Sequence, residues 1–283
     1  MTLGRQQSRR SAMRAVNVLL LVALAYLLPM SAAQAPSVPQ SDSVFLEDLT
    51  WIEVRDAIAA GKTTVIIPTG GTEQNGPHMV LGKHNYLVKY KAGEVAKRLG
   101  NALVAPVIAY VPEGEINPPT GHMRFAGTIS LPEDVFSKVL EYAARSLRQH
   151  GFIDIALVGD SGGNQAGQKL VAEALNKEWA ATNARVHHIS AYYPGRGDDW
   201  VISQGVSAED VGSHAGTHDT SSLMYLNPSM LRFSRMGLGK AGDGQGHIGN
   251  PAKATALFGQ QILAMQVEDA AKQIQELRLS SRR

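Results

Sequence analysis

The sequence predicts an α/β protein, a three-layer α/β/α sandwich built around a mostly parallel sheet. Short apolar runs rich in β-branched residues alternate along the chain with longer segments whose apolar residues recur at helical spacing. This alternation is typical of parallel sheets that carry helices on both faces. Because no internal repeat or low-complexity tract divides the chain, we expect a single domain over residues 45–283.

The composition excludes several classes of protein. With 44% hydrophobic and 18% charged residues, the chain is globular rather than disordered or fibrous. It contains no cysteine, which excludes disulfides, thiolate metal sites and a cysteine nucleophile. The first 35 residues hold four arginines and no acid, and the remainder carries 23 basic against 25 acidic side chains. A nearly neutral domain lacks the excess of basic side chains that binds nucleic acid, which argues against nucleic acid as a partner.

Residues 1–35 have the pattern of a signal peptide. A basic stretch that includes Arg9-Arg10 precedes an apolar run at residues 18–28, which has 11 residues where a membrane-spanning helix needs about 20. An Ala-x-Ala pair that ends at Ala35 then provides a cleavage site. We therefore expect export to the periplasm or the medium, by the general or the twin-arginine route, with no stable membrane insertion after cleavage. An uncleaved anchor helix is the alternative.

The first half of the domain follows a polar linker at residues 36–44, which is rich in Pro and Ser. Thr50 and Glu53 have the spacing of a capping box and predict the start of a short helix over 51–58. The β-branched run 63–67 predicts a buried strand that enters a glycine-rich loop. Next we expect a helix over 84–99 that ends at Gly100, a strand over 102–109 and a long loop over 111–130.

The second half continues the same alternation. We expect an amphipathic helix over 132–150, a strand over 154–158, a helix over 165–181, a strand over 186–193 and a final helix over 251–279. In open α/β sheets, ligands bind where loops leave the carboxyl ends of the strands. Residues 68–85 and 159–164 are the two loops that this rule selects.

The first of these loops contains carboxylate and imidazole groups close together. Glu73, His78 and His84 fall within twelve positions directly after a buried strand. These groups are the usual ligands of a divalent metal in a site without thiolates. The alternative is a glycine-rich turn in which the histidines cap helices.

Two further clusters are candidates for chemistry. Asp160 and Ser161 follow the strand predicted over 154–158, but Ser161 lacks the G-x-S-x-G setting of a nucleophilic serine. His214, His218 and Asp219 lie within six residues and could supply a general acid or base with its orienting carboxylate. For this last cluster the alternative is a simple helix start, because Asp219 is also a good N-cap.

Five segments resemble, in order over residues 45–265, the motifs of the creatininase (creatinine amidohydrolase) family. They are E-Q-N-G-P-H-M-V-L-G-K-H from Glu73, F-A-G-T-I-S-L from Phe125, G-D-S-G-G-N from Gly159, H-A-G-T-H-D-T-S from His214 and G-N-P-A-K-A-T-A-L-F-G from Gly249. The resemblance implies a layered α/β/α amidohydrolase, often hexameric, in which a pair of zinc or manganese ions activates water against a cyclic or linear amide. Such chemistry is reasonable, because a metal both polarises a carbonyl and lowers the pKa of water.

The chain departs from the metal ligands that the resemblance implies. Glu73 is retained, but Asn75 stands at the position of a His ligand, His84 at that of the bridging Asp, and Ser161 at that of a second His. An imidazole nitrogen binds one metal, so His84 cannot replace a carboxylate that bridges two. We therefore predict one divalent ion (zinc, manganese or iron) per chain, held by Glu73, His84 and Asp160.

The other predicted site residues follow from these motifs and, for His122, from its place in the Pro-rich loop before Phe125. His214 keeps the family's H-A-G position and is predicted to donate a proton to the leaving nitrogen. Asp219 stands where the family has Glu and is predicted to orient a neighbour. His122 and Asn164 are predicted to bind the substrate. His218 has no counterpart in the family motif, and we expect it to face solvent.

The predicted function is therefore a metal-dependent amidohydrolase that acts on a non-peptide C–N bond of a small-molecule amide, in a homo-oligomer. Two alternatives stay open. One is an exported, metal-free protein that binds a small amide or lactone without turnover. The other is a hydrolase without metal, in which Asp160 or Ser161 is the nucleophile.

Overall fold

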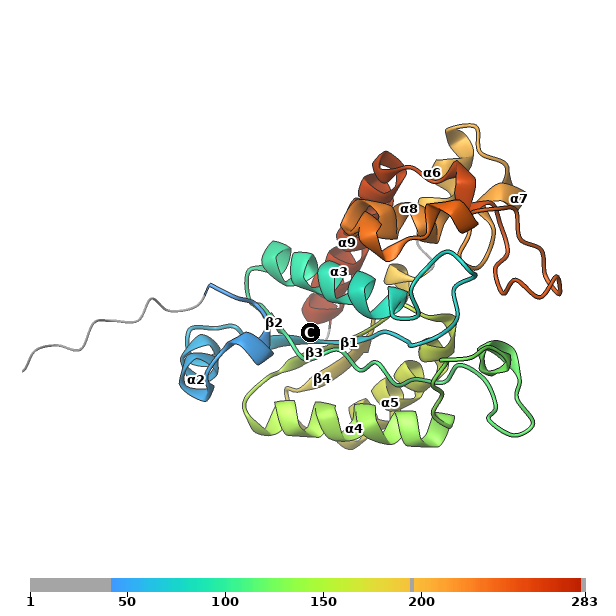
Figure 1. The fold of residues 1–283 in the computed structure, drawn as a ribbon. Helices are drawn as coiled ribbons and strands as arrows, with labels where there is room; N and C mark the ends of the chain where they lie inside the picture. Colours follow the sequence, from blue (N-terminus) through green and yellow to red (C-terminus); the bar gives the residue numbers. More distant parts are fainter. Residues whose placement is uncertain (1–41, 194–195, 281–283) are drawn as a thin grey trace, which may run out of the picture. The chain divides into compact units, whose positions relative to one another are not determined.

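The computed structural model describes residues 42–193 and 196–280. At its centre lies a parallel sheet in the order β2-β1-β3-β4, shown in Figure 1. Its strands are β1 (Thr64–Thr69), β2 (Ala102–Val104), β3 (Asp154–Gly159) and β4 (Arg185–His188). The predicted α/β/α arrangement around a parallel sheet is confirmed.

Helices cover both faces of the sheet because the side chains of a strand point alternately to its two sides. Val65 and Ile67 of β1 belong to a core that is completed by α2 (Trp51–Ala59), α4 (Glu133–Gln149) and α5 (Gln165–Glu178). Ile66, between them, belongs to the opposite core with α3 (Lys83–Leu99) and α9 (Ala256–Ser280). In Figure 1, α4 and α5 lie on one side of the sheet, and α3 and α9 on the other.

Three shorter helices extend the layer that contains α9. They are α6 (Gly197–Ser203), α7 (Ala208–Val211) and α8 (Thr217–Leu226). Helix α8 packs against α9 and also contacts α3. The H-A-G motif, residues 214–216, directly precedes α8.

Most predicted elements are confirmed, and their caps explain where they begin. Thr50 Oγ1 accepts a hydrogen bond from the backbone N–H of Glu53 at 3.3 Å, and the Glu53 carboxylate accepts one from the backbone N–H of Thr50 at 2.7 Å. This is the predicted capping box. Gly100 ends α3 with a φ of 76°, a left-handed conformation that favours glycine.

Three predicted boundaries differ from the structure by five residues each. The strand predicted over 102–109 ends at Val104, because Pro106 has no N–H to donate to the ladder. The strand predicted over 186–193 ends at His188 and turns into a 3-10 helix at Ser190–Tyr192. The final helix begins at Ala256 rather than at 251, since residues Pro251–Lys253 form a separate turn.

The amino-terminal predictions fall largely outside the described residues. The predicted signal peptide and most of the predicted linker lie there. Val44, the last residue of the predicted linker, is buried, and its carbonyl accepts a hydrogen bond from Val104 N. Within residues 42–193 and 196–280, none of the helices combines the length and the apolar character that a membrane span requires.

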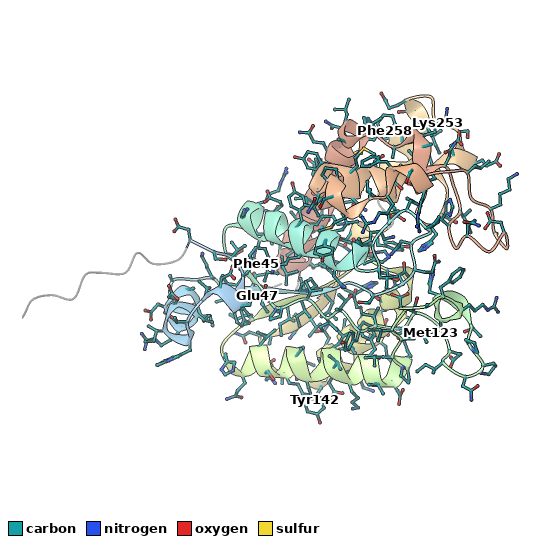
Figure 2. The ribbon with its side chains drawn as sticks, in the orientation of Figure 1. Phe45, Glu47, Met123, Tyr142, Lys253 and Phe258 are labelled. Atoms are coloured by element: carbon teal, nitrogen blue, oxygen red, sulfur yellow. The ribbon has the colours of Figure 1, made fainter. Side chains whose placement is uncertain are left out.

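Replacement of Phe136 tests the core between the sheet and helices α2, α4 and α5. Phe136 of α4 is fully buried, so Phe136→Ala is expected to lower the free energy of unfolding by about 3–5 kcal/mol through the cavity that it leaves. Tyr142 lies on the same helix, is 62% exposed and points away from the sheet in Figure 2, which makes Tyr142→Ala a matched control. Urea unfolding followed by circular dichroism measures both, and equal losses would contradict this assignment of the core.

Candidate active site

A cavity of about 740 Å³ lies at the carboxyl ends of the strands, as the topology predicts. Most of its walls come from four segments that are distant in the sequence. They are the loop after β1, the long loop after β2, the turn after β3 and the stretch from Val211 to Asp219. The two loops selected from the sequence therefore meet at one site.

Glu73 occupies the centre of this site and is 1% exposed. Its backbone N–H donates to the carbonyl of Leu81 at 3.1 Å, which closes the loop after β1 on itself. Burial tends to raise the pKa of Glu73, but the positive charges of His84 and Lys83 outweigh that effect and hold the pKa well below its usual range. Glu73 is therefore an ionised carboxylate at neutral pH.

Two histidines from other segments converge on Glu73. His122 Nε2 lies 3.2 Å from Glu73 Oε2, and His214 Nδ1 lies 3.7 Å from Glu73 Oε1. One carboxylate oxygen and one nitrogen from each imidazole fall within 4.8 Å of one another, a grouping that could hold a metal ion. The sequence predicted that His122 binds the substrate and that His214 protonates the leaving nitrogen. The structure instead places both side chains beside Glu73 as possible metal ligands.

The ring of His214 is oriented for this arrangement. His214 Nε2 donates a hydrogen bond to the backbone carbonyl of Gln74 at 2.9 Å, which leaves Nδ1 with its lone pair toward Glu73. Burial and the charge of Lys83 lower the pKa of His214 to about 4. Burial also lowers the pKa of His122. Both rings are therefore neutral at pH 7, the form that binds a metal.

The donor set fits a single divalent ion. Two imidazole nitrogens and one carboxylate oxygen are the protein ligands of many zinc sites that keep a position open for water. The predicted set of Glu73, His84 and Asp160 shares only Glu73 with this group.

His84 is held between two carboxylates instead. Its Nε2 lies 2.8 Å from Glu73 Oε1, and its Nδ1 lies 2.8 Å from Asp160 Oδ2. Burial and Lys83 tend to lower the pKa of His84, but the two carboxylates outweigh them and raise it. Both ring nitrogens of this imidazolium donate hydrogen bonds, so neither has a lone pair for a metal. This differs from the predicted ligand role because the topology places a carboxylate on each side of the ring.

Both carboxylate oxygens of Asp160 likewise contact side chains of the protein. Its Oδ1 accepts hydrogen bonds from Lys91 Nζ and Tyr192 OH, each at 2.5 Å, and its Oδ2 faces His84. Although burial opposes it, the charge of Lys91 and the contact with His84 lower the pKa of Asp160 to about 2. Asp160 thus anchors His84 rather than presenting a free oxygen to the cavity.

Asp219 forms a second ion pair, with the buried Lys83. Its Oδ2 accepts from Lys83 Nζ at 3.0 Å and from the backbone N–H of Ala215 at 2.7 Å. Burial tends to raise the pKa of Asp219, but Lys83 holds it well below its usual range. Asp219 therefore contacts both Lys83 and the backbone beside His214, and its role of orienting a neighbour stays a prediction.

Asn164 does not line the cavity. It is fully buried, and its Nδ2 donates to Thr69 Oγ1 at 2.7 Å and to the carbonyl of Gly70 at 2.9 Å. These bonds fasten the turn after β3 to the end of β1. The structure therefore gives Asn164 the role of holding the site loops together, where the sequence predicted contact with substrate.

Glu113 is a member of the site that sequence reasoning missed. It is 4% exposed, lines the cavity and lies so close to Gly71 that a Cβ there would come within 2.3 Å of its Oε1. Burial and the neighbouring Glu73 raise the pKa of Glu113 to about 10, so it is protonated at neutral pH. No motif marks this residue. The pair Gly70-Gly71 is the only sequence signal, since it permits a close approach to the loop backbone.

Fold and site together define a layered α/β protein with a carboxylate and two imidazoles at the strand ends. Residues 47–274 match the sequence profile of the creatininase family, described as creatinine amidohydrolase. The chain belongs to the creatininase family.

Known proteins of two kinds are similar to this chain. A mycofactocin precursor peptide peptidase from Mycolicibacterium smegmatis is 30% identical over 232 residues, which cover 74% of this chain and 83% of that protein. A creatinine amidohydrolase from Pseudomonas putida is 27% identical over 205 residues, 69% of this chain and 76% of that protein. The relatives therefore include one named for a peptide and one named for creatinine.

Solved structures agree on the fold. A crystal structure of creatinine amidohydrolase covers 83% of this chain and 98% of its own, with a TM-score of 0.69 and 25% identity. A point mutant of creatininase covers 83% of this chain and 99% of its own, with a TM-score of 0.71 and 24% identity. Other creatininase structures are described as a Zn-Zn type and as a manganese form.

The protonation of Glu113 predicts how stability depends on pH. The unfolded chain releases this proton near the ordinary pKa of 4.5, whereas the folded chain keeps it to about pH 10. The stability from this group is complete below pH 4.5 and declines as the pH rises. Glu113→Gln removes the ionisable group. In metal-free protein, the Tm of the variant minus that of wild type is therefore expected to increase by at least about 2–4 °C from pH 5 to pH 8.

Calorimetry of metal-free wild type and Glu113→Gln across this range measures the effect. The exposed neighbour Glu115 provides the control, because Glu115→Gln removes a carboxylate that water already solvates. A Tm difference for Glu113→Gln that stays constant with pH would contradict the buried, protonated state of this carboxyl.

Proposed function

We propose that this chain is a metal-dependent amidohydrolase that holds one divalent ion (zinc, manganese or iron) on Glu73, His122 and His214. The observation that carries the proposal is the convergence of these three side chains within 4.8 Å of one another in the wall of the cavity. When bound there, the ion would polarise an amide carbonyl and lower the pKa of an attacking water.

The charged residues around Glu73, His122 and His214 favour binding of a single ion. His84 is a cation between Glu73 and Asp160, and Lys83 is a second cation paired with Asp219. His84 stands where the family resemblance implies a carboxylate that bridges two metal ions, and Lys83 adds a second buried positive charge to the same site. Together with the replacements at Asn75 and Ser161, they favour one metal ion per chain rather than two.

The substrate that we propose is an amide whose C–N bond is cleaved by water. The relatives named for creatinine and for a precursor peptide both support this chemistry, one with a cyclic amide and the other with a peptide. A non-peptide amide agrees with the expectation from the sequence, and the peptide relative extends the proposal to linear peptide bonds. Export to the periplasm or the medium and assembly into a homo-oligomer, a hexamer by family resemblance, complete the proposal.

The two alternatives are less well supported by the geometry. Asp160 is a poor nucleophile because both of its oxygens accept hydrogen bonds from cationic or phenolic partners. Ser161 has no hydrogen bond to a histidine in the described part of the chain, and the Glu113 carboxyl that it contacts is protonated at neutral pH, so neither group serves as its general base. A metal-free binding protein remains the alternative that metal analysis decides.

Metal analysis of variants distinguishes the two ligand sets. Glu73→Gln and His214→Ala each remove a ligand, and we expect zinc affinity to fall by more than about 100-fold, since even the partners that orient metal ligands contribute about 10- to 100-fold. Asp160→Asn removes only an anchor of His84 and is expected to cost less than about 100-fold. Chelator competition measures the affinities, with circular dichroism to verify folding.

Either of two results would contradict this assignment. If Asp160→Asn loses zinc as fully as Glu73→Gln, the set predicted from the sequence holds the metal. If reconstituted wild type binds no transition metal, the metal-dependent proposal fails and one of the two metal-free alternatives applies.

Activity should follow the metal. We expect purified wild type to hydrolyse at least one member of a panel of creatinine, other cyclic amides and short peptides, and to lose more than about 90% of that activity on dialysis against a chelator. Zinc or manganese should restore it. Activity that survives complete metal removal would support the nucleophilic alternative and overturn the proposal.

A further inference from the structure

His218 and Asp198 form a pair in the cavity wall that the metal group does not use. His218 is the second residue of α8, and Asp198 is the second residue of α6. His218 Nδ1 lies 2.5 Å from Asp198 Oδ1, and both residues line the same cavity as Glu73 and His214. The sequence predicted that His218 faces solvent, whereas its side chain is 16% exposed and lies in the cavity wall.

The ring of His218 is fixed in place by its surroundings. A Cβ on Gly197 would lie 2.9 Å from His218 Cε1 and 3.1 Å from Ile262 Cγ2. The absence of a side chain at Gly197 therefore provides the space that the ring occupies, beside α9. Packing on one side and the carboxylate of Asp198 on the other define the orientation of the imidazole.

The hydrogen bond to Asp198 also selects the tautomer. A carboxylate accepts the proton on Nδ1, so Nε2 is left with its lone pair. Within residues 42–193 and 196–280, Nε2 of His218 has no hydrogen-bond partner and is not enclosed. This nitrogen is therefore available to a molecule in the cavity.

The other histidines of the cavity have no such nitrogen. Both nitrogens of His84 contact carboxylates. His214 directs one nitrogen to the carbonyl of Gln74 and the other to Glu73. His122 contacts Gln74 with one nitrogen and Glu73 with the other. Since His214 belongs to the candidate metal group, the proton-donor role predicted for it needs another residue.

We propose that His218 is the general acid and base of this site and that Asp198 is its positioning residue. The proposal rests on the proposed amidohydrolase function. As the oxygen of the attacking water forms its bond to the amide carbon, one proton of that water passes to His218 Nε2. As the C–N bond breaks and its electron pair goes to nitrogen, the same proton passes to that nitrogen. Water is thereby added across the bond, and His218 returns to its neutral form.

Site-resolved labelling tests the open nitrogen without any substrate. Diethyl pyrocarbonate acylates imidazole nitrogens that carry a free lone pair, and peptide mass spectrometry locates the products. In the zinc-loaded full-length protein, we expect His218 to be modified at least about tenfold faster than His84, His122 or His214. Modification of His218 no faster than that of His84 would overturn the proposal.

Comparison of leaving groups tests the proton transfer. An amine must be protonated as it leaves, whereas an acidic phenol leaves as its anion. The probes are an acetyl-glycyl amide of 7-amino-4-methylcoumarin and the matching ester of 7-hydroxy-4-methylcoumarin. We expect His218→Ala to slow the amide by about 10²- to 10⁴-fold, a loss at least tenfold greater than for the ester. Asp198→Asn should show the same selectivity to a smaller degree.

The controls separate this role from the others. Asp199→Asn removes the same charge from the neighbouring, exposed position of α6 and should leave both rates unchanged. Zinc affinity should also be unchanged in His218→Ala. Equal losses on amide and ester would overturn the proton-transfer role. Failure of zinc-loaded wild type to cleave either probe would count against the proposed function instead, and labelling would then decide on His218.

Discussion

The imidazolium of His84, buried between Glu73 and Asp160, is the interaction on which the site depends. It joins the loop after β1 to the turn after β3, and its charge keeps Glu73 ionised in a place from which water is nearly excluded. Buried ions are costly to desolvate and persist when each has a partner with good geometry. Lys91 on Asp160 and Lys83 on Asp219 satisfy the same condition. The ligand candidates are thus held by a network that is already balanced in charge.

This network is the reason for proposing one metal ion per chain rather than two. The replacement of a carboxylate by His84 substitutes a cation where the family resemblance implies a bridging anion. A second divalent ion would then meet a positive charge, whereas a single ion on Glu73, His122 and His214 would not have to displace it. Glu113 adds to the same balance, because its proton relieves the repulsion that two adjacent carboxylates would otherwise have.

The division of labour among the histidines follows from what each ring nitrogen contacts. Where both nitrogens contact carboxylates, as in His84, the ring is a structural cation. Where one nitrogen donates to a backbone carbonyl, as in His214, the other is oriented as a ligand. His218 has a carboxylate on one side only, and so its second nitrogen is open to the cavity. Sequence position alone does not distinguish these three cases.

The sequence by itself determined the layered fold, the order of its elements and the family, because hydrophobic periodicity and local motifs such as the Thr50–Glu53 capping box act over a few residues. It also located the strand ends where the site lies, and it identified Glu73. Only the tertiary structure decided that His122 and His214 accompany Glu73, that Asp160 and Asn164 serve the scaffold, and that Glu113 and His218 belong to the site. The reason is that ligand sets, ion pairs and tautomers depend on contacts between distant segments, such as Gln74 and His214, which are 140 residues apart, and no local pattern encodes such contacts.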